Sequence, residues 1–564
     1  RLSRSSEGLW STQQLAESAV IDAADIGSKE AEFLEASRKH QRKRQIVRNL
    51  LIGSIPLLAG LTYGAAEYAA HRNLSKRIAS YLAEGTSELQ SARRRNREVE
   101  ALRKSAFTAF DSMNIADGEA MWSRAISATV EAERSYSRAS QTFEAALTAD
   151  GSNLSAKDLL ADVLYERALI AERDRRPQQL DDLLQRMTLY DVGQSRLRRW
   201  NAPAVLSVQT KPTGARITIG KYEHDQKGRR LLTGIRDLGM SALSDVSLSP
   251  GSYLLTVVAP GHSEVRYPIL LGREEKLSLQ ISLPTQSQVP SGYVYVPPGR
   301  FLFGSGAEEA MRKGMLNTVP IHELKTDGFL IAKTETTFAD WLAFLQALSA
   351  DKRKQYMAEP TNGTLPGAVG LAQLPSGEWE LTLQPTNKKY IARGTQNIVY
   401  SSRKQNQEQR WLKIPVSGVT LQDAKDYAAW MDKSGKLPGA RLCHEQEWER
   451  AAKGADDREW PHGDELLPGD ANFDLTYGAD AASMGPDEVS SYPQSRSPFG
   501  VDDMAGNVLE WTDSFLNKGE SLVRSGSYFF SALVQRSTNR SQLDATTRSP
   551  GVSLRLCATL KLMP

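Results

Sequence analysis

The pattern of apolar and polar residues changes along the chain, and its first clear feature is an uncharged apolar run. Residues 50–66 read LLIGSIPLLAGLTYGAA, and Ile46 and Val47 extend the run backwards. This length is at the lower limit for a helix that crosses a bilayer. We therefore predict one transmembrane helix over residues 46–67. The alternative is a buried helix of a soluble domain.

The residues before this segment are strongly basic. They are Arg38, Lys39, Arg42, Lys43, Arg44 and Arg48. Basic flanks stay on the cytoplasmic side of a membrane. We expect residues 1–45 to be the cytoplasmic helical tail of an upstream module and the domains after residue 70 to be periplasmic or extracellular. Gly60 and Gly64 form a small-xxx-small pair, which can pack two helices together, so a homo-oligomer stays open.

Helical spacing of apolar residues continues over residues 68–200. Leu160, Val163, Leu164 and Ala168 recur at intervals of three and four in a segment rich in Ala, Leu, Glu and Arg. We predict a helical stalk here. A tetratricopeptide-like helix pair is one form of it, and a plain bundle is the other.

Alternation of apolar and polar residues replaces helical spacing over residues 204–284. It is clearest around Val205–Val208, Ala215–Ile219 and Tyr253–Val257, with turns at Pro212-Thr213-Gly214 and Pro250-Gly251. This pattern predicts a small β-sandwich. The segments TKPTGARITIG, LSPGSYLLTVVAPGH and LSLQISLP resemble a PEGA domain, which implies a spacer or adhesive role and not catalysis. Residues 285–291 are predicted to be a linker.

The remaining residues, 292–560, combine short helices with frequent Gly and Pro. Two amphipathic helices are predicted over Phe338–Leu348 and Leu421–Met431, with N-caps at Thr336 or Thr337 and at Thr420. A third begins near His444. The rest predicts packed loops and strands, so this domain belongs to the α+β class.

Composition excludes several kinds of function. The formal net charge of +3 over 564 residues is too small to indicate nucleic-acid binding, and two cysteines cannot build a disulfide-dense or four-cysteine zinc scaffold. The seven histidines are scattered, and neither an HExxH motif nor a GxxxxGK[ST] phosphate loop occurs. We therefore predict no catalytic residue in this chain.

Several segments in the distal domain together carry one family resemblance. They include GYVYVPPGRFLFGSG, PVSGVTLQDAKDYAAWM, RLCHEQEWERAAKG, FGVDDMAGNVLEWTDSF and GVSLRLC. In this order they resemble the formylglycine-generating-enzyme, or sulfatase-modifying-factor, family. The resemblance implies a C-type-lectin-like fold. The tail before the apolar run resembles the helix that follows STAND-type nucleotide-binding modules in bacterial signalling proteins.

The resemblance also implies copper chemistry, which needs a cysteine pair near the C-terminus. Residues 527–551, where that pair would lie, contain no cysteine. Copper(I) prefers thiolate ligands, so we expect no copper. Cys443 and Cys557 lie elsewhere. They either pair in an oxidising compartment or remain two buried thiols.

Calcium ligands are the second implication of the resemblance. A first site would use the carboxylates of Asp503 and Glu510 and the carbonyls of Gly506 and Val508. A second would use Asn472, the Phe473 carbonyl and Asp480. Hard oxygen ligands suit Ca²⁺. The alternative is that Asp503 and Glu510 accept backbone amide protons in a tight loop.

The segment without cysteines carries polar residues that we predict to bind a ligand. They are Gln535, Arg536, Asn539, Arg540 and Arg548. Arginines in such a groove bind carboxylates or phosphates. Solvated surface or buried ion pairs are the alternatives.

These expectations describe a single-pass protein of the inner membrane. Its catalytically silent distal domain would recognise an unknown protein or glycan and couple it to an upstream signalling module, such as a STAND NTPase or a Ser/Thr kinase. Two alternatives remain. The chain could be an active oxidase or another enzyme of the same fold, or a membrane effector or scaffold released from its upstream part by proteolysis.

Overall fold

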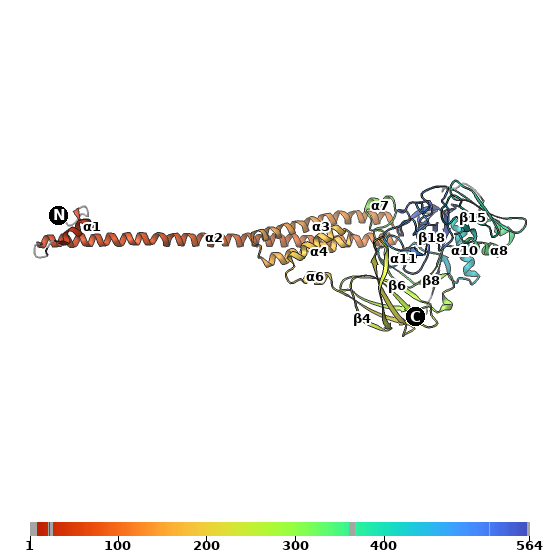
Figure 1. Cartoon of the computed structure of the whole chain (residues 1–564), viewed down its shortest axis with the longest axis horizontal. Helices are drawn as coiled ribbons and strands as arrows, with labels where there is room; N and C mark the ends of the chain where they lie inside the picture. The colour runs from red at the N-terminus through yellow and green to blue at the C-terminus, as the bar shows by residue number, and fades with distance from the viewer. Residues whose placement is uncertain (1–7, 21, 23–25, 360–366, 518, 561–564) are drawn as a thin grey trace. The chain divides into compact units, whose positions relative to one another are not determined.

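A computed structural model describes residues 8–20, 22, 26–359, 367–517 and 519–560. The chain divides into two compact units, residues 1–93 with 133–163 and residues 94–132 with 164–564. The colours of Figure 1 follow the order of the elements along the chain. Each unit is described by itself below.

Long helices dominate the N-terminal third. Helix α2 is continuous for 84 residues, so the predicted apolar segment and the start of the predicted stalk belong to one helix. The helices of this part are α1 (Thr12–Glu17), α2 (Ser28–Asp111), α3 (Ile115–Ala149), α4 (Leu154–Arg173), α5 (Pro177–Tyr190) and α6 (Ser195–Trp200).

The first unit contains the apolar segment of α2. In the part of the chain that the structure describes, this is the one helix long and apolar enough to cross a membrane, and none of its apolar window is buried. Length and composition are those of a membrane anchor or a signal segment. Farther along α2, a Cβ on Gly85 would overlap the ring of the fully buried Phe143, so glycine permits close packing with α3.

In the second unit, residues 204–282 form two sheets. One has the order β4-β1-β7 and the other β3-β2-β5-β6. Their inward residues, among them Leu206, Ile217 and Leu255, belong to one apolar cluster, as alternation along a half-buried strand requires. The strands are β1 (Ala204–Lys211), β2 (Arg216–His224), β3 (Arg230–Met240), β4 (Leu243–Leu248), β5 (Gly251–Val258), β6 (Val265–Leu271) and β7 (Lys276–Ser282).

The distal domain mixes short helices with small sheets. Its sheets have the orders β10-β9, β17-β22-β11-β8, β12-β13-β14, β15-β16 and β20-β19-β18-β21. The helices are α7 (Glu309–Gly314), α8 (Phe338–Gln346), α9 (Ala350–Lys354), α10 (Leu421–Lys433) and α11 (Glu445–Lys453). The strands are β8 (Tyr293–Val296), β9 (Gly299–Phe303), β10 (His322–Thr326), β11 (Phe329–Ala332), β12 (Ala368–Gln373), β13 (Trp379–Gln384), β14 (Tyr390–Arg393), β15 (Asn397–Val399), β16 (Glu408–Arg410), β17 (Ala440–Leu442), β18 (Leu509–Asn517), β19 (Glu520–Arg524), β20 (Ser541–Asp544), β21 (Val552–Leu554) and β22 (Leu556–Thr559).

Capping boxes fix the starts of the two predicted amphipathic helices. The Asp340 amide donates to Thr337 Oγ1 at 3.3 Å, and the Thr337 amide donates to the Asp340 carboxylate at 3.0 Å. Thr420 and Asp423 repeat this exchange at the start of α10. Such reciprocal bonds satisfy amides that a helix leaves unpaired, so both predicted helix starts are confirmed, with Thr337 as the first cap.

Residues 94–132 pack directly on the distal domain within the second unit. Ala106, Phe110 and Trp122 share an apolar cluster with Phe301 and Phe303. At the edge of this cluster, the indole of Trp122 donates to Glu309 at 2.8 Å. The end of α2 and the start of α3 are therefore part of the folded core of the distal domain, whereas the sequence predicted a separate stalk.

Candidate functional site

Three of the five predicted ligand-binding residues are buried and already have protein partners. The Gln535 amide donates to the carbonyls of Ser527 and Phe530, both at 2.9 Å. Asn539 donates to the Ser525 carbonyl, and Arg540 pairs with the buried Glu445 at 2.5 Å. These side chains hold the segment together, so they do not line a ligand groove.

The other two, Arg536 and Arg548, lie apart in separate settings. Arg548 pairs with Asp423 at 2.8 Å near the start of α10. Arg536 pairs with Glu459 at 3.2 Å and lies over the Trp460 ring. Arg536 also lines a cavity of about 580 Å³. The binding role of these five residues stays a prediction.

A buried ion network surrounds Arg540 and the nearby Arg524. Arg524 donates to Glu449 at 2.6 Å and lies 3.5 Å from Glu445, while Lys453 lies 3.3 Å from Glu449. Helix α11 therefore places Glu445 and Glu449 in the interior, where they pair with Arg524 and Arg540. Buried charges are tolerated only when paired in this way. Burial lowers the pKa of Lys453.

The first predicted calcium set surrounds an arginine. Glu510 accepts hydrogen bonds from Arg555 at 2.7–3.1 Å and from the Trp448 indole at 2.6 Å. Asp503 accepts the Ser490 amide proton at 2.5 Å, and the Gly506 carbonyl accepts from the Ser525 hydroxyl at 3.3 Å.

The Glu510 carboxylate is occupied in this arrangement, because both of its oxygens accept hydrogen bonds from Arg555 or Trp448. Among the described residues, no group of three His, Cys, Asp or Glu side chains is placed to hold a metal. Arg555 supplies the positive charge beside Glu510, and its guanidinium also lies 3.7 Å from the Glu335 carboxylate. Burial raises the pKa of Asp503 to about 6, and burial together with the Asp503 charge raises the pKa of Glu335.

The residues of the second predicted calcium set have separate hydrogen-bond partners. Asp480 accepts from its close neighbours Ala482 and Ser483, both at 3.0 Å, at the protein surface. The buried Asn472 donates to the Gly485 carbonyl at 2.9 Å, and the Phe473 carbonyl accepts the Thr476 amide proton. Asp480 therefore bonds within its own turn, and its place in the second calcium set stays a prediction.

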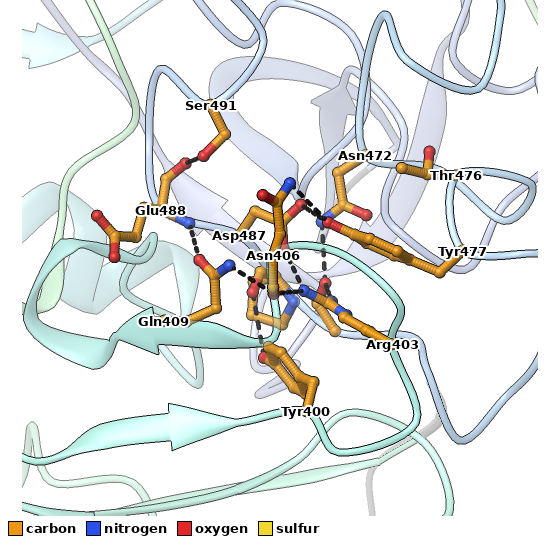
Figure 2. Close-up of polar contacts among 12 residues, drawn as sticks. Tyr400, Arg403, Asn406, Gln409, Asn472, Thr476, Tyr477, Asp487, Glu488 and Ser491 are labelled. Atoms are coloured by element: carbon orange, nitrogen blue, oxygen red, sulfur yellow. Dashed lines mark hydrogen bonds and ion pairs between the residues drawn. The ribbon is translucent and has the colours of Figure 1, made fainter.

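The carboxylate near Asn472 is instead Asp487, which is paired with Arg403 (Figure 2). Arg403 donates to the carbonyls of Ser483 and Gly485 at 2.7 and 2.8 Å, and Gly485 also accepts from Asn472. The guanidinium lies 3.7 Å from the Tyr400 ring centroid and 3.9 Å from that of Tyr477. No sequence motif predicts this network, because its members are separated by long loops.

Cys443 and Cys557 form a disulfide bond in the structure. Cys443 directly follows β17 and Cys557 lies on the neighbouring strand β22, and both are buried. They are the only cysteines of the sequence. No thiol is therefore free to bind copper in this state.

Comparison with known proteins identifies the distal domain. Residues 280–560 match the family model of the sulfatase-modifying factor enzyme 1-like domain, FGE-sulfatase. The chain thus carries an FGE-sulfatase domain, as the motifs predicted.

Relatives of this domain differ in their named activities. The chain is 28% identical to the serine/threonine-protein kinase pkn1 of Chlamydia caviae over 39% of this chain and 27% of the kinase. It is 26% identical to the inactive C-alpha-formylglycine-generating enzyme 2 of Mus musculus over 39% of this chain and 68% of that protein. It is 28% identical to hercynine oxygenase of Mycolicibacterium smegmatis over 45% of this chain and 53% of that protein.

Coverage limits what these relatives say about the whole chain. The chain spans 27% to 31% of the length of the kinases that it matches. Among solved structures, PvdO from Pseudomonas aeruginosa matches with 21% identity over 48% of this chain and 94% of that one, at a TM-score of 0.34.

Proposed function

We propose that this chain is the membrane-anchored recognition part of a signalling protein. Its FGE-sulfatase domain binds a protein or glycan ligand and does not oxidise cysteine. The apolar part of α2 crosses the inner membrane once, with the basic N-terminal flank in the cytoplasm and the distal domains in the periplasm or outside the cell. The two sheets of residues 204–282 are a PEGA-like spacer.

The observation that carries this proposal is the state of the cysteines. Oxidation with copper(I) needs soft thiolate ligands. Both cysteines of the chain are joined in a disulfide, and the segment 527–551 contains buried amides and guanidinium groups where the family chemistry needs thiols. The relative named as inactive formylglycine-generating enzyme 2 shows that this family includes members without the oxidase activity.

Coupling to a signalling module is supported by continuity of the chain. Helix α2 includes the apolar segment, and its last turns belong to the distal core through Ala106 and Phe110. The matched kinases are relatives in which an FGE-like region belongs to a protein named as a kinase. A kinase or NTPase module before the tail of residues 1–45 completes the proposal.

A copper titration tests the proposed lack of oxidase chemistry. The purified full chain in detergent micelles, kept non-reducing, competes with bicinchoninate for copper(I). We expect the chromophoric copper complex to remain unchanged on adding protein. Withdrawal of one copper ion per chain at stoichiometric protein would overturn the proposal and favour the oxidase alternative.

A further inference from the structure

The part of α2 that precedes the apolar segment has a dense positive charge. Its cations are Arg38, Lys39, Arg42, Lys43, Arg44 and Arg48. No Asp or Glu occurs between Ala36 and Ala66, so no acidic residue along this stretch of α2 offsets them. A uniformly basic stretch of helix therefore leads directly into a uniformly uncharged one.

All six side chains are exposed, and none has an ion-pair or hydrogen-bond partner among the residues that the structure describes. The segment before α1 contacts a different side of α2. The Trp10 ring meets the Phe33 ring edge-on with centroids 5.7 Å apart, and the Trp10 carbonyl accepts from Gln41 at 2.9 Å. At about 100° of rotation per residue, Phe33 and Gln41 lie on one half of the helix and Arg42 on the other. The cations are thus accessible to a partner outside the chain.

The helical rise places three of these cations at the level of lipid headgroups. With a span of residues 46–67, a rise of about 1.5 Å per residue puts Arg42, Lys43 and Arg44 about 3–6 Å outside the hydrocarbon. The headgroup layer on each side of a bilayer is about 5–7 Å thick. Because α2 continues without interruption from Ser28 to Asp111, the helix holds the three residues at this level.

The other end of the apolar segment differs in both charge and position. Its cations begin about 7 Å and end about 15 Å beyond residue 67, again from the helical rise. They are Arg72, Lys76 and Arg77, and Glu67 lies between them and the apolar segment. These cations lie beyond the headgroup layer, so only the N-terminal end places unopposed positive charge within it.

We infer that Arg42, Lys43 and Arg44 bind the headgroups of anionic phospholipids around α2. Guanidinium and ammonium groups donate charge-assisted hydrogen bonds to phosphate oxygens. A zwitterionic lipid carries the same phosphate, but its own ammonium group offsets the charge, so the three cations favour lipids with a net negative charge. Three successive helical residues cover about 200° of the circumference, which suits several lipids around the helix. The inference rests on the proposed function, because it requires α2 to cross a membrane.

Electron spin resonance on the full chain in phosphatidylcholine vesicles tests the inference. Spin-labelled phosphatidylglycerol and spin-labelled phosphatidylcholine are the two probes, and the motionally restricted fraction of each measures its contact with the protein. We expect phosphatidylglycerol to be favoured by about two- to fivefold, since attraction to an anionic headgroup contributes about fivefold per cation near the surface. This preference should disappear in 1 M salt, where the Debye length is about 3 Å.

Two triple variants separate the proposed site from general charge. The variant Arg42→Gln/Lys43→Gln/Arg44→Gln should lose the preference for phosphatidylglycerol. The matched control removes the same charge from the other end by replacing Arg72, Lys76 and Arg77 with Gln, and it should keep most of the preference. All six replaced side chains are exposed, so both variants should keep the melting temperature of the wild type.

The possible outcomes distinguish this inference from the proposed function. Equal restriction of both labelled lipids by the wild-type chain, or equal losses in the two triple variants, would overturn the inference. The chain would still float with the vesicles in a density gradient, so its membrane anchor would stand. A chain that does not float would overturn the anchor and this inference together.

Discussion

Arg403 and Asp487 form an ion pair with 2.5 Å between Nη1 and Oδ1, and neither side chain is more than 1% exposed. The remaining carboxylate oxygen of Asp487 accepts from the hydroxyls of Tyr477 and Tyr492 at 2.7 and 2.6 Å. Both oxygens of the buried Asp487 therefore have protein partners. The pair joins the loop after β15 to the loop that precedes Val489, so it fixes two long loops to each other.

Replacing Arg403 tests the structural importance of this pair. Arg403→Met leaves Asp487 buried without a cation, and breaking a buried pair in this way costs about 3–5 kcal/mol. Urea unfolding followed by tryptophan fluorescence measures the loss. The control is Arg410→Met, whose exposed pair contributes at most about 1 kcal/mol. Equal effects of both substitutions would contradict the account.

The Tyr477 hydroxyl gives this network a dependence on alkaline pH. Burial and the Asp487 charge raise the pKa of Tyr477 from 10.0 to about 12. The unfolded chain therefore loses this proton first, so the hydroxyl stabilises the fold fully below pH 10 and loses this effect as pH rises through 12.

Tyr477→Phe removes both the hydrogen bond to Asp487 and the titration. We expect a loss of about 1.5–3 kcal/mol at pH 8, as for a bond to a charged group. The difference in unfolding free energy between Tyr477→Phe and wild type should be smaller at pH 11.5 than at pH 8. Urea midpoints at the two pH values measure it, and a penalty that stays constant would show that Tyr477 does not titrate as described.

The Cys443–Cys557 disulfide should make the distal domain sensitive to reductant. It joins residues 114 positions apart, and the loss of such a bond costs about 2–5 kcal/mol. Calorimetric scans should show a lower melting temperature with dithiothreitol. The double variant Cys443→Ala/Cys557→Ala should melt at the lower temperature with or without reductant. Maleimide-reactive thiols in the native, untreated chain would refute the pairing.

Trp122 tests the attachment of residues 94–132 to the distal domain. Trp122→Ala removes an indole that packs beside Phe301 and donates to Glu309, at a cost of about 3–5 kcal/mol. Hydrogen exchange should then speed up over residues 94–132 and around α7. The control is Leu154→Ala, because Leu154 is 66% exposed and its loss should change stability by about 0.5 kcal/mol or less. Unchanged exchange in the Trp122 variant would mean that this contact does not hold the helices.

Local patterns in the sequence predicted local structure well. The caps at Thr337 and Thr420 and the strands around Val205, Ile217 and Leu255 could be predicted because their signals lie within a few neighbouring residues. Strands β12 to β16 were not predicted from the sequence.

The site could be predicted only in part, because its contacts join distant residues. Asp487 was not singled out from the sequence, because its partner Arg403 lies 84 positions away along the chain. Arg536 lines a cavity, and Arg175, which lines the same cavity, comes from the helical region. Nothing in the sequence near either arginine indicates that they face the same space.

The central claim is that this FGE-sulfatase domain recognises a ligand without oxidising cysteine. The most direct test incubates the purified full chain with a cysteine peptide, copper(I) and oxygen, beside an active formylglycine-generating enzyme, and follows the peptide by mass spectrometry. The account predicts that the peptide cysteine stays unconverted with this chain while the active enzyme converts it. Formylglycine formed by this chain would contradict the account.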